Sequence, residues 1–307
     1  MKIAVIGAGA MGSLFGSYLS RRNDVYLIGR NAQKLSELDR KGITVREKDG
    51  TEEQFHPHAS AGCAGLPIMD LVIVFVKAMS TESALEGCRS IIGPETYLLT
   101  LQNGAGHERK LLKFADESHV IIGSTQHNSS VQEPGVIAHG GDGITGIGLV
   151  GGDSERITHL AQEFTACGIV CHVSDSIRKQ IWDKLFINTA ASSLTAVLQV
   201  PLGFILEDAY ARTFMERLVH EAVEVANAEG FAVFSEEEVL QSVKGVLKRS
   251  KNGYTSIYTH VKTGQKTEVE TISGYVIERA EALGIPVPYH RAVVLLIHAL
   301  EDRNQSA

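Results

Sequence analysis

The sequence predicts an α/β protein in two parts, an open parallel β-sheet covered by helices and then an all-α domain. Apolar runs of strand length alternate with helical patterns from residue 2 to residue 173, which indicates a parallel sheet with both faces covered. After Ser174 the strand signals stop, and helical patterns continue to the end of the chain. We therefore expect two domains, residues 1–174 and residues 175–307.

The first thirty residues predict a strand, a glycine turn, a helix and a second strand. Lys2–Ile6 is a short run rich in β-branched residues, and the pattern G-x-G-x-x-G follows it directly at residues 7–12. Apolar residues between 14 and 19 then recur with helical spacing, and residues 25–28 form another apolar run. This order is typical of an N-terminal Rossmann-type domain that binds a dinucleotide.

Each glycine of the turn has a physical task. Gly7 lets the chain leave the strand tightly, Gly9 has no Cβ to block a pyrophosphate, and Gly12 lets the helix approach the sheet. The N-terminus of the helix adds unpaired N–H groups and a partial positive charge for the phosphates. Because glycine turns are common, a βαβ unit that binds nothing is the alternative.

The end of the second strand indicates which dinucleotide is bound. A site for NAD usually places an acid about twenty residues after the glycines, where it accepts the ribose 2′-OH. Here the strand ends in Gly29, Arg30 and Asn31, with no acid in reach. A guanidinium suits a 2′-phosphate, so Arg30 predicts NADP(H); an ordinary surface arginine is the alternative.

Further strands place two polar residues at the edge of the sheet where ligands gather. A helix is expected at 32–41, a hairpin around Asp49–Gly50, and buried strands at 70–76, 97–101 and 119–123. Ligands of open α/β sheets bind at the carboxyl ends of the strands. Lys77 and Asn103 follow two of these ends, so both are candidates for the pocket. Their alternatives are a solvated lysine and a turn-forming Asn-Gly pair.

The rest of the first domain is expected to be glycine-rich β-structure, then a helix and a last strand. Residues 135–150 predict antiparallel strands at the end of the sheet, joined by a Gly-Gly-Asp-Gly turn. A helix at 154–166 and a strand at 168–173 complete the domain. Earlier in the chain, a helix is also predicted at 81–92, after the strand at 70–76. Three histidines on strands or turns are interpreted as structural: His127, His139 and His172.

Charge and cysteine content exclude several classes of protein. A net charge of −7 gives no long-range attraction to nucleic acid or anionic lipid, and no apolar run approaches the length of a membrane span. The first apolar stretch is only as long as a strand, so we expect no signal peptide and a cytoplasmic protein. Four scattered cysteines make no disulfide framework. Cys167, Cys171 and His172 could be metal ligands, but buried thiols are commoner in such a strand, so no metal is predicted.

Six helical patterns follow in the second part of the chain. Ser235 with Glu238 is a capping-box start, and Gly230 and Gly284 are good C-terminal stops. The predicted helices are 176–200, 207–229, 235–251, 254–261, 268–283 and 289–302.

The first of these helices carries the residues best suited to catalysis. From 181 to 198 it is apolar nearly all round, with Asp183 and Lys184 as its charged residues, and Asn188 and Ser192 lie four and eight positions after Lys184. Burial lowers the pKa of a lysine, which suits it to protonating the oxygen of a ketone as hydride adds to the carbon. The alternatives are a Lys184–Asp183 surface pair and a snorkelling lysine.

The sequence resembles the ketopantoate reductases (2-dehydropantoate 2-reductases) over nearly its whole length and in the family's motif order. The matching segments in the first part are residues 2–12, Val76-Lys77-Ala78, Gln102–Gly106 and a hairpin from Pro134 to Gly148. Those in the second part are Trp182–Asn188 with Leu194-Thr195-Ala196, Ser256, Lys266–Glu270, Ser273–Tyr275 and Gly284–Pro288.

The resemblance implies roles for individual residues. Lys184 would be the general acid of ketone reduction, Glu268 would accept hydrogen bonds from the substrate hydroxyl, and Ser256 would bind the substrate carboxylate. Asn188 and Ser192 would hold the substrate. The residues implied to bind NADP(H) are Gly7, Ala8, Gly9, Ala10, Met11, Gly12, Arg30, Lys77 and Asn103.

Two departures from the family pattern lie near the expected substrate pocket. Ser192 stands where the family's well-characterised members carry a second asparagine, and Tyr258-Thr259-His260 replaces a Met-Leu-Gln-Asp type of segment. The resemblance implies NADPH-dependent reduction of ketopantoate for pantothenate and coenzyme A synthesis. A paralogue that reduces another small 2-oxo acid is one alternative. A non-catalytic NADP(H) sensor is another, although this chain keeps both Lys184 and Glu268. The oligomeric state stays open, with a homodimer as one option.

Overall fold

The computed structural model describes residues 1–141 and 143–305, and this part of the chain forms two compact units. The first unit contains Met1–Gln102 and His107–Ile177, and the second contains Asn103–Gly106 and the chain from Arg178 onward. The predicted fold class, a Rossmann-type domain followed by a helical domain, is confirmed. The domain limits 1–174 and 175–307 stay a prediction.

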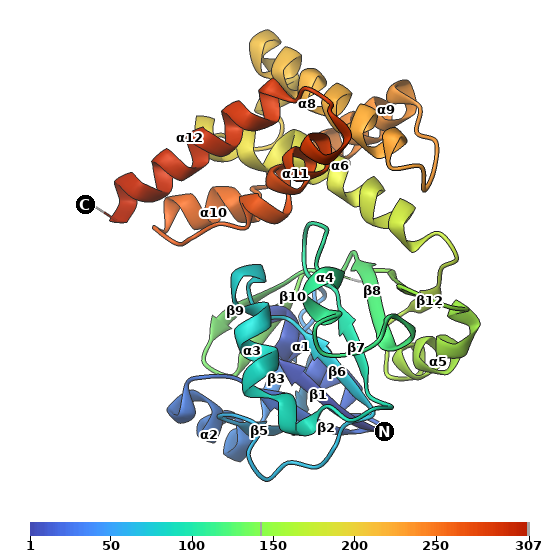
Figure 1. The fold of residues 1–307 in the computed structure, drawn as a ribbon. Coiled ribbons are helices and arrows are strands. Elements are labelled where there is room, and N and C mark those ends of the chain that lie inside the picture. Colours follow the sequence, from blue (N-terminus) through green and yellow to red (C-terminus); the bar gives the residue numbers. More distant parts are fainter. Residues whose placement is uncertain (142, 306–307) are drawn as a thin grey trace. The chain divides into compact units, whose positions relative to one another are not determined.

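A mostly parallel sheet forms the frame of the first unit (Figure 1). It has eight strands, in the order β12-β11-β8-β7-β6-β1-β2-β5. β1 pairs in parallel with β2 and with β6. Residues 3–5 of β1 are buried, and so is the whole of β6, as a parallel sheet covered on both faces requires. Its strands are β1 (Lys2–Ile6), β2 (Asp24–Ile28), β5 (His58–Ser60), β6 (Leu71–Val74), β7 (Tyr97–Thr100), β8 (Val120–Thr125), β11 (Thr145–Leu149) and β12 (Cys171–Val173).

A second sheet of four strands, in the order β4-β3-β10-β9, belongs to the same unit. It contains β3 (Ile43–Arg46), β4 (Glu52–Phe55), β9 (Ser129–Glu133) and β10 (Val136–His139). The hairpin predicted around Asp49–Gly50 is confirmed, because β3 and β4 pair antiparallel on either side of it.

Residues 135–150 form two strands, as predicted, but the prediction that these strands lie together at the end of the sheet is wrong. β10 pairs with β3 and β9 in the small sheet, whereas β11 pairs antiparallel with β8 in the large one. Strand propensity is local but pairing partners are set by the tertiary fold, so the sequence pattern could not separate the two. The expected Gly-Gly-Asp-Gly turn includes Asp142, which lies outside the described residues.

Helices cover the large sheet. The predicted helix at 32–41 is confirmed, whereas the one predicted at 81–92 ends early and continues as a short 3₁₀ turn. The α-helices are α1 (Ala10–Leu19), α2 (Ala32–Lys41), α3 (Thr81–Gly87), α4 (Glu108–Leu111) and α5 (Thr158–Ala166). The 3₁₀ turns are η1 (Ala78–Ser80), η2 (Arg89–Ile91), η3 (Glu117–His119) and η4 (Ser154–Ile157).

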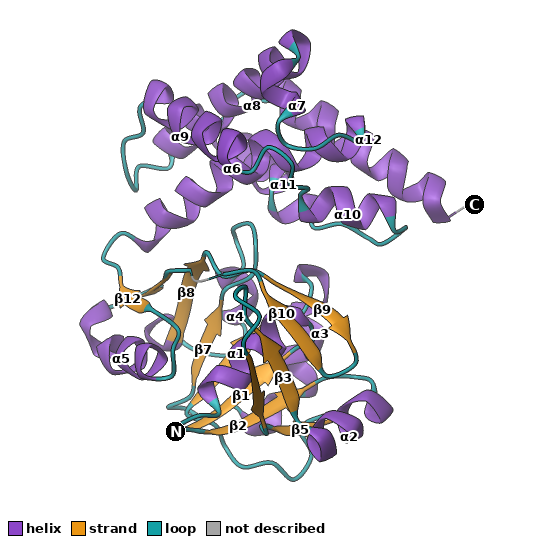
Figure 2. Cartoon of the chain, turned by 180° about the vertical axis from the view of Figure 1, so that it is seen from behind, coloured by secondary structure: helices purple, strands orange, loops and turns teal. Residues whose placement is uncertain are grey.

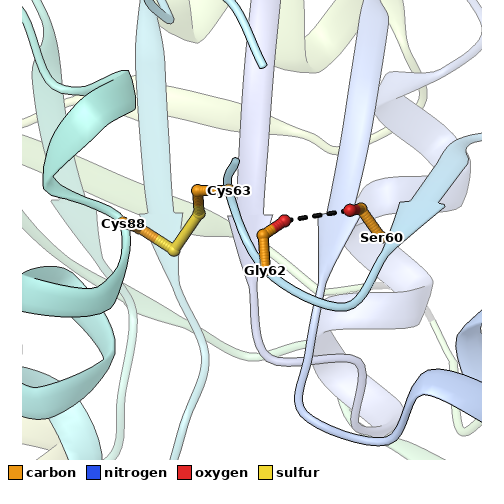
Figure 3. The surroundings of a disulfide bond; sticks show 4 residues. All are labelled: Ser60, Gly62, Cys63 and Cys88. Carbon is orange, nitrogen blue, oxygen red and sulfur yellow. Dashed lines mark hydrogen bonds between the residues drawn. A yellow bond between two sulfur atoms is a disulfide. The ribbon is translucent and has the colours of Figure 1, made fainter. Parts of the chain in front are cut away.

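A disulfide joins Cys63, in the loop before β6, to Cys88 at the end of α3 (Figure 3). Nothing in the cysteine spacing predicts this pair, because the loop places the two Cα atoms 5.2 Å apart only after it folds. The Ser60 hydroxyl donates to the carbonyl of Gly62 (2.9 Å) and shapes that loop. Cys167 and Cys171 are free thiols.

The second unit is built from helices, as Figure 2 shows in purple. Ser235 caps α9 by accepting from the N–H of Glu238, and Gly284 ends α11 in the left-handed region, as predicted. Of the helix predicted at 268–283, only the part from Ser273 is α-helical. The elements are α6 (Ile177–Leu198), α7 (Phe204–Glu207), α8 (Ala209–Ala228), α9 (Glu236–Arg249), α10 (Ser256–Lys262), η5 (Val269–Thr271), α11 (Ser273–Leu283) and α12 (Pro288–Gln305). Among the described helices, none combines the length and the apolar character needed to span a bilayer.

Candidate active site

The glycine turn between β1 and α1 has the geometry that its sequence predicts. The N–H of Gly7 donates to the carbonyl of Ile28 (2.7 Å), and Gly7 has a φ of +119°. A Cβ on Gly7 would lie 2.7 Å from the carbonyl carbon of Phe75, and one on Gly12 would lie 1.9 Å from the oxygen of Gly7. Both positions therefore require glycine, and α1 packs directly against the turn.

Gly9 faces open space, unlike the other two glycines of the motif. No described atom lies within 4 Å of the place where its Cβ would be, so a phosphate could approach the backbone there. Gly9 is also the N-cap of α1; no side chain caps this helix, and its first turn carries no acid. The first N–H groups of α1 are thus available to an anion, which fits the pyrophosphate of a dinucleotide.

Two cations lie near the end of β2, where the coenzyme ribose is expected. Arg30 is exposed after the strand, and the side chain of Asn31 caps α2 by accepting from the N–H of Lys34 (2.9 Å). The ammonium of Lys34 donates to the carbonyl of Ala8 in the glycine turn (2.8 Å). Lys34 was not among the residues predicted from the sequence, although its place in the first turn of the helix that follows Arg30 could have drawn attention to it.

Gln102 ties together the carboxyl ends of β6 and β7. Its amide donates to the carbonyl of Val76 (2.5 Å) and to the hydroxyl of Thr81 (3.0 Å), and its oxygen accepts from Thr100 (2.9 Å). Lys77 directly follows Val76 and is half-buried at this edge of the sheet. The structure therefore places Lys77 where the sequence predicts it, in a segment held by a neighbouring glutamine.

Thr271 links the backbone at Asn103 to the backbone at Glu268 in the second unit. The Thr271 hydroxyl donates to the carbonyl oxygens of Asn103 (3.3 Å) and Glu268 (3.1 Å), and the N–H of Ala105 donates to the carbonyl of Thr271 (2.9 Å). A Cβ on Gly104 would lie 2.1 Å from that same carbonyl oxygen. Gly104 is therefore required for the loop Asn103–Gly106 to dock on the turn at Glu268.

Helix α6 carries Lys184, Asn188 and Ser192 at intervals of four residues, hence along one stripe. Lys184 and Asn188 are half-buried, and Ser192 is buried. Burial lowers the pKa of Lys184 from its usual 10.5 to about 8. Asp183, by contrast, is exposed and pairs with Lys179 one turn earlier (3.0 Å).

Thr255 holds the start of α10, and with it Ser256, against α6. Its hydroxyl caps α10 by accepting from the N–H of Tyr258 (3.2 Å) and lies 3.0 Å from the hydroxyl of Thr195. The same hydroxyl is 3.4 Å from the carbonyl oxygen of Ser192, so the structure brings Ser192 and Ser256 into one neighbourhood. The sequence did not lead us to predict the contact between the two threonines, although threonine before a helical pattern, as at Thr255, is a capping signal.

The candidate metal ligands near β12 are free thiols, of which Cys167 is buried and Cys171 is half-buried. Burial raises the pKa of Cys167 to about 11 and that of Cys171 to about 12, so neither is a thiolate at neutral pH. Within the described ranges, no three His, Cys, Asp or Glu side chains gather in a way that could hold a metal ion.

The two units thus offer complementary chemistry. The first has an open glycine turn with two neighbouring cations, which fits a phosphorylated dinucleotide. The second has an ammonium with a lowered pKa, together with amide, hydroxyl and carboxylate groups. An acid with a pKa near 8 beside hydrogen-bonding groups is suited to ketone reduction.

Comparisons with known proteins give consistent names. The family model "Ketopantoate reductase PanE/ApbA" matches residues 3–152, and "Ketopantoate reductase PanE/ApbA C terminal" matches residues 176–301. The 2-dehydropantoate 2-reductase of Halobacterium salinarum is 33% identical over 300 residues, covering 97% of this chain and 98% of that protein. The protein of the same name from Pyrococcus horikoshii is 30% identical, with 98% of each chain covered.

Solved structures with the same fold include a second enzyme name. A ternary structure of D-mandelate dehydrogenase with NADH and anilino(oxo)acetate has a TM-score of 0.92 at 29% identity, covering 99% of this chain and 100% of that one. A PanE/ApbA family ketopantoate reductase from Ralstonia eutropha JMP134 has a TM-score of 0.91 at 28% identity, with the same coverage.

Proposed function

Because the chain belongs to the ketopantoate reductase family, we propose that it catalyses the NADPH-dependent reduction of 2-dehydropantoate to pantoate. The chain is an oxidoreductase of the class that uses a nicotinamide dinucleotide. The observation that carries the proposal is the stripe on α6, where Lys184 combines a pKa of about 8 with hydrogen-bonding neighbours one and two turns later.

In this proposal, each candidate residue of the second unit has its own role in binding or reducing the substrate. NADPH, when bound, supplies the hydride that adds to the carbonyl carbon. Lys184 donates its proton to the carbonyl oxygen, and Asn188 and Ser192 orient the substrate. Ser256 binds the carboxylate of the substrate, and the Glu268 carboxylate accepts from its hydroxyl, so that an analogue without this hydroxyl leaves the acid unpaired.

The coenzyme choice rests on the end of β2. Arg30 is exposed there, and the connection to α2 contains no acid that could accept a ribose 2′-OH. The glycine turn and the segments at Lys77 and Asn103 would hold the rest of NADP(H). We further propose that the product feeds pantothenate and coenzyme A synthesis in the cytoplasm.

The test is NADPH oxidation with 2-dehydropantoate, measured for the wild type and Lys184→Ala side by side. We expect turnover by the wild type and a loss of roughly 10²-fold or more in the variant, because a general acid contributes about that much. NADPH binding by both proteins, measured by fluorescence titration, is the control for folding. A wild type that binds NADPH but leaves 2-dehydropantoate unreduced would contradict the proposed substrate.

A second candidate is the reduction of another small 2-oxo acid. Ser192 is buried on α6 at a position where the family resemblance implies asparagine, and one structure of the same fold is a D-mandelate dehydrogenase. Serine is shorter and has no amide, so the substrate side chain could be held differently. A panel of branched, hydroxylated and aromatic 2-oxo acids distinguishes the two candidates by kcat/KM. A non-catalytic NADP(H) sensor would oxidise NADPH with none of them.

A further inference from the structure

Lys34 is a cation beside the glycine turn to which neither the sequence motifs nor the family resemblance gives a role. It lies in the first turn of α2 and is half-buried, and its ammonium donates to the carbonyl of Ala8 (2.8 Å). The glycine turn and the end of β2 meet at this point, since a Cβ on Gly29 would lie 3.4 Å from that of Ala8. Lys34 therefore spans the seam between the two segments that would hold the pyrophosphate and the ribose.

The charges around this seam favour an anion. The first turn of α2 contains no acidic residue, and the partial positive charge of the helix N-terminus adds to Arg30 and Lys34. An ammonium has three N–H donors, and the Ala8 carbonyl occupies one of them. A phosphate monoester brings a charge of about −1.5 to −2 at neutral pH, which one guanidinium does not balance.

We propose that Lys34 is a second specificity-determining residue for the coenzyme and binds the ribose 2′-phosphate together with Arg30. The contact to Ala8 holds the ammonium at the seam before the coenzyme arrives, so little side-chain entropy is lost on binding. The inference rests on the proposed use of NADP(H). The competing explanation is that Lys34 only stabilises the glycine turn, and this makes a different prediction.

The experiment measures dissociation constants of NADPH and NADH for the wild type, Lys34→Met, Lys34→Gln and Arg30→Ala. Removing the Lys34 charge should weaken NADPH binding about tenfold or more while changing NADH binding less than twofold, because a hydrogen bond to a charged group is worth that much. Lys34→Gln keeps a donor for the Ala8 carbonyl but not the charge, so it should behave like Lys34→Met. Lys41→Met, at the exposed end of the same helix, is the matched control and should change neither value.

Competition of 2′-AMP and 5′-AMP with NADPH shows which phosphate of the coenzyme Lys34 contacts. Lys34→Met should weaken 2′-AMP binding and leave 5′-AMP binding in place. Equal losses for NADPH and NADH would mean that Lys34 only holds the turn, and would overturn the inference. A wild-type preference for NADPH that persists unchanged in Lys34→Met would also overturn it, while the proposed coenzyme stands. Equal wild-type affinities for NADPH and NADH would instead overturn the coenzyme choice itself.

Discussion

Lys184 shows at the scale of one residue how the environment sets chemistry. Its side chain is attached to a helix whose neighbours are mostly apolar, and burial shifts its pKa to about 8. A lysine in water would stay protonated up to a pH near 10 and give up its proton reluctantly. The lowered value places the acid close to the pH at which an enzyme works.

The pH dependence of turnover follows from this shift. Protonated Lys184 is the form that donates in the reductive direction, so kcat should fall as pH rises past about 8, approaching tenfold per pH unit. The measurement is kcat for 2-oxo acid reduction from pH 6 to 10, with the residual activity of Lys184→Ala as the control. That residual activity should lack the inflection, and a flat wild-type profile up to pH 10 would remove Lys184 from the acid role.

At the scale of elements, single threonines and glycines decide which segments meet. Thr255 joins the start of α10 to α6, and Thr271 joins the Asn103–Gly106 loop to the turn at Glu268. Each contact uses a short side chain that accepts or donates at a backbone group, so its geometry is strict.

The loop contact predicts a strong effect of Gly104→Ala. The new Cβ would lie 2.1 Å from the Thr271 carbonyl oxygen, so the loop must leave its dock. Gly50→Ala is the matched control, because Gly50 has a similar φ of +88° but no described atom within 4 Å of the new Cβ. We expect Gly104→Ala to lose about 1–3 kcal/mol more than Gly50→Ala in urea unfolding, and also to lower kcat/KM. Equal losses in the two variants would show that the contact does not constrain the loop.

The start of α12 predicts a pH-dependent stability. Buried Glu221 accepts from the N–H groups of Tyr289 (2.8 Å) and His290 (2.9 Å) and from the His290 ring (2.8 Å). Burial lowers the pKa of His290 despite the nearby carboxylate. The folded state therefore holds His290 neutral, while the unfolded chain takes up a proton near pH 6.5.

Because the unfolded state binds more protons, this site loses stability as pH falls below about 6.5, by at most about 1.4 kcal/mol per pH unit. The free energy of unfolding in urea, measured between pH 7.5 and 5, should fall less steeply for His290→Asn than for the wild type. His159→Asn, at an exposed position at the start of α5, is the control. Identical slopes for His290→Asn and the wild type would contradict a neutral buried His290.

At the scale of the whole molecule, the chain passes between the two units after Gln102, after Gly106 and after Ile177. The first unit is therefore not one continuous segment, and the four residues Asn103–Gly106 are packed with helices that follow them by more than 160 residues. The segment Asn103–Gly106, whose sequence indicates only a turn after β7, thus contributes to the fold of the helical unit.

The disulfide between Cys63 and Cys88 raises the free energy of unfolding by restricting the unfolded chain. Cys63 and Cys88 are separated by 25 residues, and closing a loop of that length removes conformational entropy worth about 3.5 kcal/mol from the unfolded state. Replacing both with alanine should lower the free energy of unfolding by about that amount under oxidising conditions. Cys171→Ala, a free thiol on β12, is the control. A difference below about 1 kcal/mol, or no effect of a reductant on the wild type, would contradict the bond.

Most of the fold could be predicted from the sequence because its signals are local. The glycine turn at residues 7–12, the caps at Ser235 and Gly284 and the period of the apolar residues each report on backbone geometry within a few positions. The same reasoning found the stripe on α6, since residues four apart on a helix are neighbours whatever surrounds them.

What only the tertiary structure decided is which distant segments meet. The sequence alone determined the glycine turn, the family and most of the order of strands and helices, although it did not predict β5, β9 or α4. The tertiary structure placed β10 and β11 in different sheets, paired Cys63 with Cys88, brought Lys34 to Ala8 and docked Asn103–Gly106 on Thr271. Propensity and periodicity are properties of neighbouring residues, whereas sheet partners, disulfides and loop docking depend on contacts that form after the chain has folded back on itself.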